Sequence, residues 1–216
     1  MSIARLNASP TARLWIGGSP CSGKSTIASR LSSRYGFGLY HCDEHWDRHL
    51  ASASAVAQPR MCRLRGMSAD EIWLRPVDDQ VEDELALYQE QFPMILSDLA
   101  GSVDRVVVAE GAALLPECVA PLITDPRQAV WIVPTEAFQR RTYRTRGPWV
   151  EQVLSRCSDP AECWERWMAR DAAFALRVAE QANTLGLRVI WVDGSRGIDA
   201  ILAETQSWLS SPSGLA

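Results

Sequence analysis

Residues 17–26, which read GGSPCSGKST, constrain the fold of this chain more than any other stretch of its sequence. They contain a glycine, four variable residues, a second glycine, a lysine and a serine, with Gly18, Gly23, Lys24 and Ser25 at the fixed positions. A short apolar run precedes the loop and a helix-forming run follows it, which is the context in which this pattern is informative. The glycines allow the backbone to curl with its N–H groups pointing inward. We therefore expect a strand–loop–helix unit that holds phosphate at the start of a helix.

Lys24 stands out by composition as well as by position, because it is the only lysine among the 22 lysines and arginines of the chain. A compact ammonium group fits a narrow phosphate cradle, whereas the planar guanidinium of arginine is wider. We expect Lys24 to reach the β- and γ-phosphates of ATP and the Ser25 hydroxyl to ligate Mg²⁺. The alternative, a chance match in a glycine-rich turn, explains neither the flanking runs nor the lone lysine. The residues expected to bind the nucleotide are Gly18, Ser19, Pro20, Cys21, Ser22, Gly23, Lys24, Ser25 and Thr26.

The bulk composition is that of an ordinary globular domain and disfavours several other classes of protein. The length of 216 residues suits one α/β domain, and 47% of the residues are hydrophobic while 22% are charged. The formal charge of −4 argues against a nucleic-acid partner. We see no signal peptide and no apolar stretch near the ~20 residues that span a bilayer. The spacings of the six cysteines predict neither a zinc site nor disulfides, so we expect a cytoplasmic protein with reduced thiols.

Apolar runs alternate with helical patterns along most of the chain, which predicts a parallel sheet with right-handed crossovers. The helix after the phosphate loop is expected at residues 24–35, where Gly36 would end it, and the last helix is expected at residues 198–209. The five expected strands cover residues 13–17, 37–42, 103–109, 129–133 and 187–192.

Other segments have less regular patterns. An apolar stripe at residues 77–99 predicts a long helix that Pro93 should kink or divide. Residues 51–66 are rich in Ala and Ser and then basic, so we interpret them as a mobile loop. The two ends of the chain, residues 1–10 and 210–216, are expected to be loose.

Charged residues follow three of the expected strands. Asp43 follows the strand at residues 37–42, and Glu110 comes at the end of the strand expected at residues 103–109, directly after Ala109. Because ligands of open α/β sheets bind beyond the carboxyl ends of the strands, both acids are candidate site residues. Arginines gather after the fourth strand, and so close a cluster repels itself unless it is solvated or faces anions. This cluster consists of Arg140, Arg141, Arg144 and Arg146.

The phosphate loop, the two acids and the arginine cluster together resemble the adenylate-kinase-like P-loop kinases. This group includes nucleoside monophosphate, shikimate and gluconate kinases, uridine kinase, chloramphenicol phosphotransferase and zeta toxins. The chain has no N-K-x-D guanine motif, which needs a second lysine, and no LSGGQ-like stretch of transport ATPases. The resemblance implies a P-loop NTPase three-layer α/β/α sandwich with a five-stranded parallel sheet in the order 2-3-1-4-5. It also implies a single P-loop kinase domain, residues 1–216, with an acceptor-binding region at about 44–100 and an arginine-bearing lid at about 136–150.

The resemblance also implies roles for the charged residues. Asp43 would orient or deprotonate an acceptor hydroxyl, although an acid at this place also suits a helix cap. Glu110 would hold a Mg²⁺-bound water; the family often has Asp here, and contact with substrate or a turn before Gly111 are the alternatives. Lid arginines clamp the transferring phosphoryl group, and we assign Arg141 and Arg144 to this role. The alternative is a solvated basic helix face, and the sequence does not decide which arginine reaches the phosphate.

The three histidines and one tryptophan near Asp43 are further candidates. His45 and His49 have the i,i+4 spacing of a helical metal pair, but the sequence places no third ligand, so we favour substrate contacts at the rim of the cleft. Trp46 is a candidate lining residue of the acceptor pocket, although aromatic side chains fill cores more often.

We therefore expect an ATP-dependent phosphotransferase that moves the γ-phosphate of ATP to a small-molecule acceptor, with ATP and Mg²⁺ as cofactors. A toxin-like or antibiotic-modifying kinase would share this chemistry and differ in its acceptor. A regulatory protein that binds or hydrolyses ATP is the alternative from another class, and it would show no acceptor-stimulated turnover. The acidic net charge disfavours a nucleic-acid kinase, and we expect no membrane partner. The sequence leaves the acceptor and the oligomeric state open.

Overall fold

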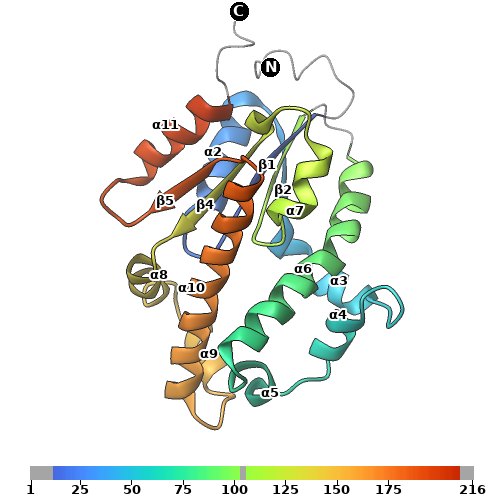
Figure 1. Cartoon of the computed structure of the whole chain (residues 1–216), viewed down its shortest axis with the longest axis vertical. Helices are drawn as coiled ribbons and strands as arrows, with labels where there is room; N and C mark the ends of the chain where they lie inside the picture. Colours follow the sequence, from blue (N-terminus) through green and yellow to red (C-terminus); the bar gives the residue numbers. More distant parts are fainter. Residues whose placement is uncertain (1–11, 103–105, 210–216) are drawn as a thin grey trace, which may run out of the picture.

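The computed structural model describes residues 12–102 and 106–209, and its centre is a five-stranded parallel sheet (Figure 1). The strand order is β2-β3-β1-β4-β5, which confirms the expected order 2-3-1-4-5. The strands are β1 (Ala12–Gly18), β2 (Gly38–His41), β3 (Val106–Glu110), β4 (Ala129–Pro134) and β5 (Val189–Val192).

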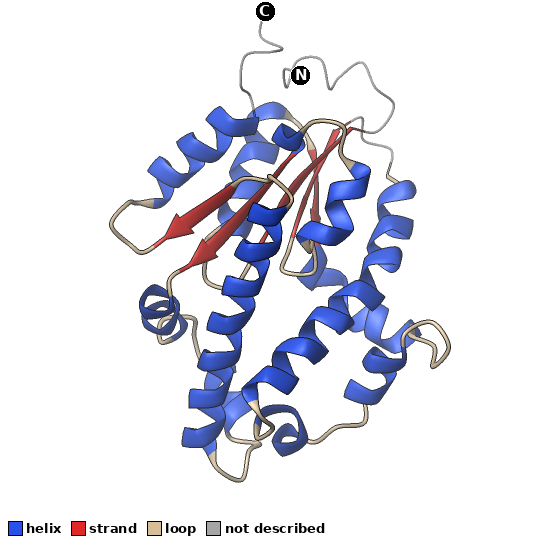
Figure 2. Ribbon diagram, in the orientation of Figure 1, coloured by secondary structure: helices blue, strands red, loops and turns tan. Residues whose placement is uncertain are grey.

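Helices cover both faces of the sheet, so that the fold has three layers (Figure 2). The helices α2 and α11 pack on one face, and α6, α7 and α10 pack on the other. Every residue of β3 and β4 is buried, as in a parallel strand that is covered from both sides. The helices are α2 (Lys24–Tyr35), α3 (Trp46–Ser52), α4 (Pro59–Leu64), α5 (Ala69–Trp73), α6 (Val77–Ala100), α7 (Pro116–Val119), α8 (Glu136–Tyr143), α9 (Trp149–Leu154), α10 (Pro160–Thr184) and α11 (Ile198–Leu209).

Side chains of β1, β3 and β4 alternate between two apolar clusters. From β1, Leu14 and Ile16 face α2 and α11, whereas Trp15 faces α6 and α10. From β4, Val130 and Ile132 join the first cluster in the same way. The sheet therefore has two buried faces, and its carboxyl-terminal edge is the place where loops and polar side chains gather.

The first helix has the bounds that the sequence predicts. α2 begins at Lys24, directly after Gly23, and ends at Tyr35, before Gly36, which has the left-handed conformation of a helix-terminating glycine. The last helix, α11, also has its expected bounds. The expected loose segments, residues 1–10 and 210–216, and the start of the expected third strand, residues 103–105, lie outside the described residues.

Two expectations need correction. Residues 51–66 are not one loop, because α4 forms within them and buries Met61 against α6. The Glu90 carboxylate of α6 accepts hydrogen bonds from the backbone N–H groups of Arg60 and Met61, both at 2.9 Å, which caps the start of α4. Pro93 lies inside α6, which continues through it as one helix, so the division that was one of its two expected effects does not occur.

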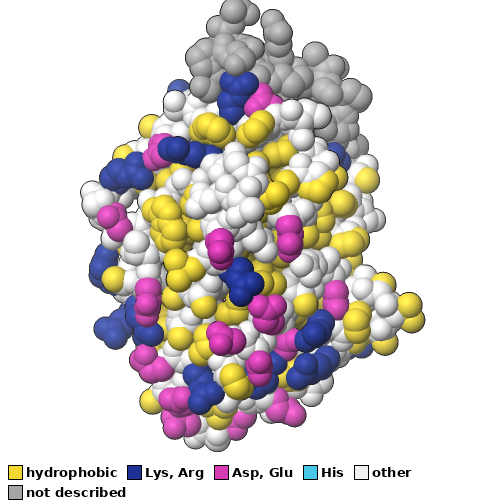
Figure 3. Space-filling view, in the orientation of Figure 1, with side chains coloured by type: hydrophobic (Ala, Val, Ile, Leu, Met, Phe, Trp, Pro, Cys, Tyr) yellow, Lys and Arg dark blue, Asp and Glu magenta, His cyan; other side chains and the backbone are white. Residues whose placement is uncertain are grey.

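The described part of the chain contains no helix with both the length and the apolar character needed to cross a membrane. On the face drawn in Figure 3, basic and acidic side chains are interspersed rather than separated into regions of one sign.

Gly18, the last residue of β1, should tolerate no side chain. Its φ is +126°, and a Cβ atom would lie 1.9 Å from the Ile132 carbonyl oxygen of β4. We expect Gly18→Ala to lower the free energy of unfolding by about 3 kcal/mol, from backbone strain and overpacking. Gly101→Ala is the control, since Gly101 has a helical φ of −82° and open surroundings, and it should change stability by less than about 0.5 kcal/mol. Urea unfolding measures both values, and equal effects would contradict the geometry.

Candidate functional site

The phosphate loop is a tight curl of backbone between β1 and α2. Three of its residues have positive φ angles: 126° at Gly18, 66° at Cys21 and 84° at Gly23. Cys21 is the only non-glycine residue with a positive φ in the described part of the chain. The curl ends at the first residue of a twelve-residue helix, whose N-terminal N–H groups and dipole favour an anion at that position.

The side chain of Lys24 folds back into this curl. Its Nζ donates to the Ser19 carbonyl oxygen at 2.6 Å and to the Ser22 hydroxyl at 3.4 Å, and only 7% of the residue is exposed. Burial lowers the pKa of Lys24 from its ordinary value, and the nearby carboxylates of Glu110 and Asp43 partly oppose that shift. A bound anion would favour the charged form of this amine, so the site is chemically suited to phosphate.

A cavity of about 680 Å³ lies over the loop, a size in the range of small-molecule binding sites. Three parts of the chain enclose it: the phosphate loop, the strand ends that carry Asp43 and Glu110, and the segments that follow β4 and β5. Its lining residues are Pro20, Cys21, Ser22, Gly23, Lys24, Ser25, Thr26, Asp43, Glu110, Ala112, Phe138, Thr142, Tyr143, Arg146, Trp149, Val192, Arg196, Ile198 and Ile201.

Glu110 is the last residue of β3 and is 3% exposed. It pairs with His41 of the neighbouring strand β2, with 2.5 Å between Glu110 Oε1 and His41 Nδ1. The two residues are direct partners in the parallel register, so the strand pairing itself brings them together. No local pattern indicates this pair, because β2 and β3 are far apart along the chain.

Oxygen-bearing side chains gather beside the start of α2. Ser25 and Thr26 are exposed there and share a hollow of about 510 Å³ with Asp43, Glu44 and Glu110. Hydroxyl and carboxylate oxygens are the donors that Mg²⁺ prefers. The donor set predicted from the sequence, Ser25 and Glu110, is therefore brought to one place and fits a hard divalent cation.

Among the four arginines after β4, only Arg146 lines the cavity over the loop. Its guanidinium lies 5.4 Å from the ring centroids of both Tyr143 and Trp149, and its Nη1 is 3.8 Å from Cys21 Sγ. Cation–π contacts of this kind hold the charge toward the loop.

The two arginines favoured by the sequence lie elsewhere. Arg141 donates to the Asp193 carbonyl oxygen at 3.3 Å and lies over the Phe138 ring, whereas Arg144 is exposed in the turn that follows α8. Arg140 pairs with two acids, Glu136 and Glu165. The sequence placed Arg146 in the arginine cluster but did not assign it to the phosphoryl group, and Arg196, which also lines the cavity, was missed. Both positions depend on how the loops fold back over the sheet.

A second cavity, of about 610 Å³, opens between α3, α5, α6 and α10. Asp43 lines this cavity as well as the first, so that one exposed carboxylate lies where the two cavities meet. Trp46 also lines the second cavity, three residues after Asp43. The lining residues are Asp43, Trp46, Leu50, Leu64, Arg65, Ile72, Trp73, Arg75, Gln80, Asp83, Glu84, Leu87, Tyr88, Gln91 and Arg170.

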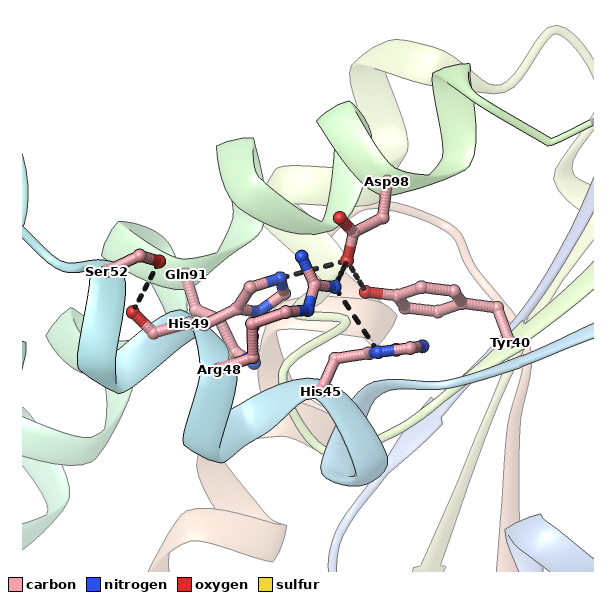
Figure 4. Close-up of polar contacts among 7 residues, drawn as sticks. All are labelled: Tyr40, His45, Arg48, His49, Ser52, Gln91 and Asp98. Atoms are coloured by element: carbon pink, nitrogen blue, oxygen red, sulfur yellow. Dashed lines mark hydrogen bonds and ion pairs between the residues drawn. The ribbon is translucent and has the colours of Figure 1, made fainter.

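Asp98 of α6 gathers polar side chains from the neighbouring α3 and from the end of β2 (Figure 4). Its Oδ2 accepts hydrogen bonds from Tyr40 at 2.6 Å, Arg48 at 2.5 Å and His49 Nε2 at 2.9 Å. The ring of His45 stacks on Tyr40 at 4.5 Å between centroids. The cluster fixes α3 on α6, and so holds the segment that carries Asp43 and Trp46.

The histidine pair is therefore not arranged as a metal site. Both ring nitrogens of His49 have partners, because Nδ1 lies 3.2 Å from Gln91 Nε2 while Nε2 contacts Asp98. Since Gln91 Nε2 can only donate, His49 Nδ1 accepts and the ring is the neutral Nε2–H form. Burial lowers the pKa of His49, and the Asp98 carboxylate partly opposes this. Neither His45 nor His49 is among the lining residues of the two cavities described above, and the substrate contact that the sequence favours stays a prediction.

Comparisons with known proteins bear on the fold. No protein-family model matches the sequence, and no curated protein matches it. Shikimate kinase from Acinetobacter baumannii in complex with shikimate superposes with a TM-score of 0.50 at 11% identity, with 94% of both chains covered. A gluconokinase from Sinorhizobium meliloti gives a TM-score of 0.46 at 14% identity over 93% of this chain and 91% of its own. The chain thus has the three-layer fold of P-loop kinases, which confirms the resemblance at the level of the fold.

The Asp98 cluster should contribute to stability in a pH-dependent way. Burial alone would raise the pKa of Asp98, but the hydrogen bonds from Arg48, Tyr40 and His49 lower it to about 2, from 3.8. A lowered folded-state pKa contributes stability above pH 3.8, and this contribution is lost as the pH falls toward 2. We expect Asp98→Asn to cost about 1–2 kcal/mol at pH 7, and the difference from the unsubstituted protein to shrink below pH 4.

Urea unfolding at several pH values measures this dependence. Asp47→Asn is the control, because Asp47 is an exposed acid of α3, the helix that the Asp98 cluster fixes on α6, and its effect should stay within about 0.5 kcal/mol. A difference between Asp98→Asn and the unsubstituted protein that does not change with pH would contradict the role assigned to this carboxylate.

Proposed function

We propose that this chain is an ATP-dependent phosphotransferase that moves the γ-phosphate of ATP to a small-molecule acceptor. The observation that carries the proposal is the position of Asp43, which lines both the cavity over the phosphate loop and the second cavity. Two binding spaces that meet at one carboxylate are what a transfer between two bound molecules requires. The fold, which a shikimate kinase shares, is consistent with this activity.

On the nucleotide side, residues 18–26 would surround the β- and γ-phosphates. Lys24 is a buried cation of this loop. The bound triphosphate would compensate for the hydration that the Lys24 amine loses through burial. Val192, Ile198 and Ile201 supply an apolar wall of the same cavity, which suits the flat base of a nucleotide. The guanidinium of Arg146 would face the transferring phosphoryl group.

Magnesium would be held by the Ser25 hydroxyl, with the Glu110 carboxylate binding through a water molecule. When bound, Mg²⁺ supplies positive charge that stabilises the phosphate oxygens during transfer. His41 occupies one oxygen of Glu110 and orients the carboxylate, which leaves the other oxygen for the cation or its water.

On the acceptor side, residues 44–100 would form most of the binding region. Asp43 would accept the hydroxyl proton as the hydroxyl oxygen bonds to the γ-phosphorus and the bond to the β–γ bridging oxygen breaks, releasing ADP. Residues 136–150 would act as the lid of this single domain and exclude water, which otherwise competes as acceptor.

Substitution of Lys24 and Asp43 separates nucleotide binding from transfer. We expect Lys24→Ala to lower ATP-dependent transfer by about 10²–10³-fold, because a buried cation at the phosphates is lost. Asp43→Asn should lower acceptor-stimulated ADP release by about 10²–10⁴-fold while ATP affinity changes little. Coupled ADP release with pooled small metabolites measures transfer, and calorimetry measures ATP binding. Full transfer by Lys24→Ala would refute the proposal, and ATP binding without acceptor-stimulated turnover would favour a regulatory protein.

Arg146 and Arg144 provide a matched pair of substitutions within the lid. We expect Arg146→Ala to lower ADP release by about 10²-fold, because its guanidinium faces the cavity over the phosphate loop. Arg144→Ala should stay within about twofold of the unsubstituted rate, since that side chain does not line this cavity. A larger loss of ADP release in Arg144→Ala than in Arg146→Ala, or a loss in Arg141→Ala alone, would instead assign the contact with the phosphoryl group to Arg144 or Arg141.

A further inference from the structure

Three side chains of the kind that bind metals meet at the end of the molecule where α5, α9 and α10 come together (Figure 1). Asp70 lies in the first turn of α5, Cys157 follows α9, and Cys163 lies in the first turn of α10. One ligand atom from each lies within 4.8 Å of the other two, and this is the only such group among residues 12–102 and 106–209. None of the three lines the cavity over the phosphate loop or the second cavity.

The connection between α9 and α10 brings the two cysteines together. The Cys157 N–H donates to the Leu154 carbonyl oxygen at 3.0 Å, where α9 ends. The Cys163 N–H donates to the Asp159 carbonyl oxygen at 3.0 Å, where α10 begins. Cys157 is 7% exposed and Cys163 is 0% exposed, so both thiols are buried between these helix ends.

A carboxylate from a distant part of the sequence completes the group. Asp70 Oδ1 accepts a hydrogen bond at 2.8 Å from the Ser158 N–H, which belongs to the connection between α9 and α10. Arg166 of α10 donates to the carbonyl oxygens of Leu74 and Arg75, both at 2.9 Å, directly after α5. These contacts fix α5 on α10. The spacing of the cysteines along the chain does not indicate the group, because its third donor comes from α5.

The donor set suits a tetrahedral metal ion of the zinc type. Thiolates and carboxylate oxygens are zinc ligands, whereas Mg²⁺ prefers oxygen alone. With zinc–sulfur bonds of about 2.3 Å, the two sulfur atoms would lie about 3.8 Å apart, so the ligand atoms need to approach one another by about 1 Å. Asp70 is only half-buried, so the ion, and a water molecule as its fourth ligand, would reach the group from this side.

Apolar packing explains the two cysteines but not the acid. A buried thiol behaves as a small apolar group, so a pair of buried cysteines is ordinary. A carboxylate beside that pair is not explained in this way, because an apolar neighbourhood disfavours a charge. A carboxylate that a neighbouring N–H group holds toward two thiols is instead typical of a metal site, in which such hydrogen bonds orient the ligands.

We propose that Asp70, Cys157 and Cys163 bind one divalent ion of the zinc type, with water as the fourth ligand. Each thiol loses its proton to the solvent when its sulfur binds, and no electrons are transferred. The ion cross-links α5 to the connection between α9 and α10, so its role is structural. The inference goes beyond the proposed function and does not depend on it, because the group lies outside both cavities.

Titration of the full chain with Cd²⁺ tests the site, after treatment with a chelator and in the presence of a phosphine reductant. Thiolate ligands give bound cadmium an ultraviolet charge-transfer band, to which the oxygen donors Ser25 and Glu110 do not contribute. We expect the band to saturate at one ion per chain and to be abolished in Cys157→Ala and in Cys163→Ala. Asp70→Asn should weaken cadmium binding at least tenfold.

The control is Cys118→Ala, which removes a half-buried cysteine of α7 that is not part of the group, and it should leave the band unchanged. Stability gives a second readout. Zn²⁺ at a hundredfold excess over its dissociation constant should raise the Tm of the unsubstituted protein by about 5–10 °C. The Tm of Cys163→Ala should not respond to Zn²⁺, and circular dichroism checks that each variant is folded.

Absence of the thiolate band in the reduced, unsubstituted protein would overturn the inference, whether or not Cys157 and Cys163 form a disulfide in air. A band, or a Zn²⁺-dependent rise in Tm, that persists in folded Cys163→Ala would overturn it as well. Lys24→Ala, which tests the proposed function, should keep the thiolate band. The metal site and the phosphotransferase activity therefore fail separately.

Discussion

The burial of the Lys24 ammonium group inside a curl of backbone is the constraint on which the rest of the site depends. The curl needs positive φ angles at Gly18, Cys21 and Gly23, and it places the amine against the Ser19 carbonyl oxygen. Burial by itself disfavours the charged form of Lys24. Polar or anionic partners that contact the amine offset this cost. In the described protein these are a carbonyl, a hydroxyl and more distant carboxylates, and a phosphate group would be a stronger partner.

The parallel sheet brings the other charged groups to this loop. All five strands point the same way, so their carboxyl ends meet at one edge, where the register places Glu110 of β3 beside His41 of β2. Asp43 follows β2 at the same edge and lines both cavities, while the Asp98 cluster fixes the helix after it on α6. Arg48 and His49 of α3, which donate to Asp98, thus hold the segment with the exposed carboxylate of Asp43 in place without contacting that carboxylate.

The helix α10 gives the molecule its connection between the two cavities. Most of its buried side chains are apolar and pack on the sheet or on α6, but Arg170 and Asp171 interrupt that stripe with two charges. Charges inside a packed interface are costly unless they are paired, and here one guanidinium serves two carboxylates. The same pair also anchors Tyr143, whose hydroxyl donates to Asp171 Oδ2 at 2.6 Å.

The sequence by itself determined the phosphate loop, the bounds of α2 and α11, and the presence of five strands, because these depend on neighbouring residues and on local patterns. The strand order followed from the resemblance to P-loop kinases. The helix within residues 51–66 was missed, because its first turn is capped by Glu90, which lies far along the chain. Only the tertiary structure decided which arginine lies over the loop, that His49 binds Asp98 and that Glu84 and Asp171 share Arg170. These contacts join residues that are distant in sequence, and the packing of helices on the sheet, rather than any local spacing, brings them together.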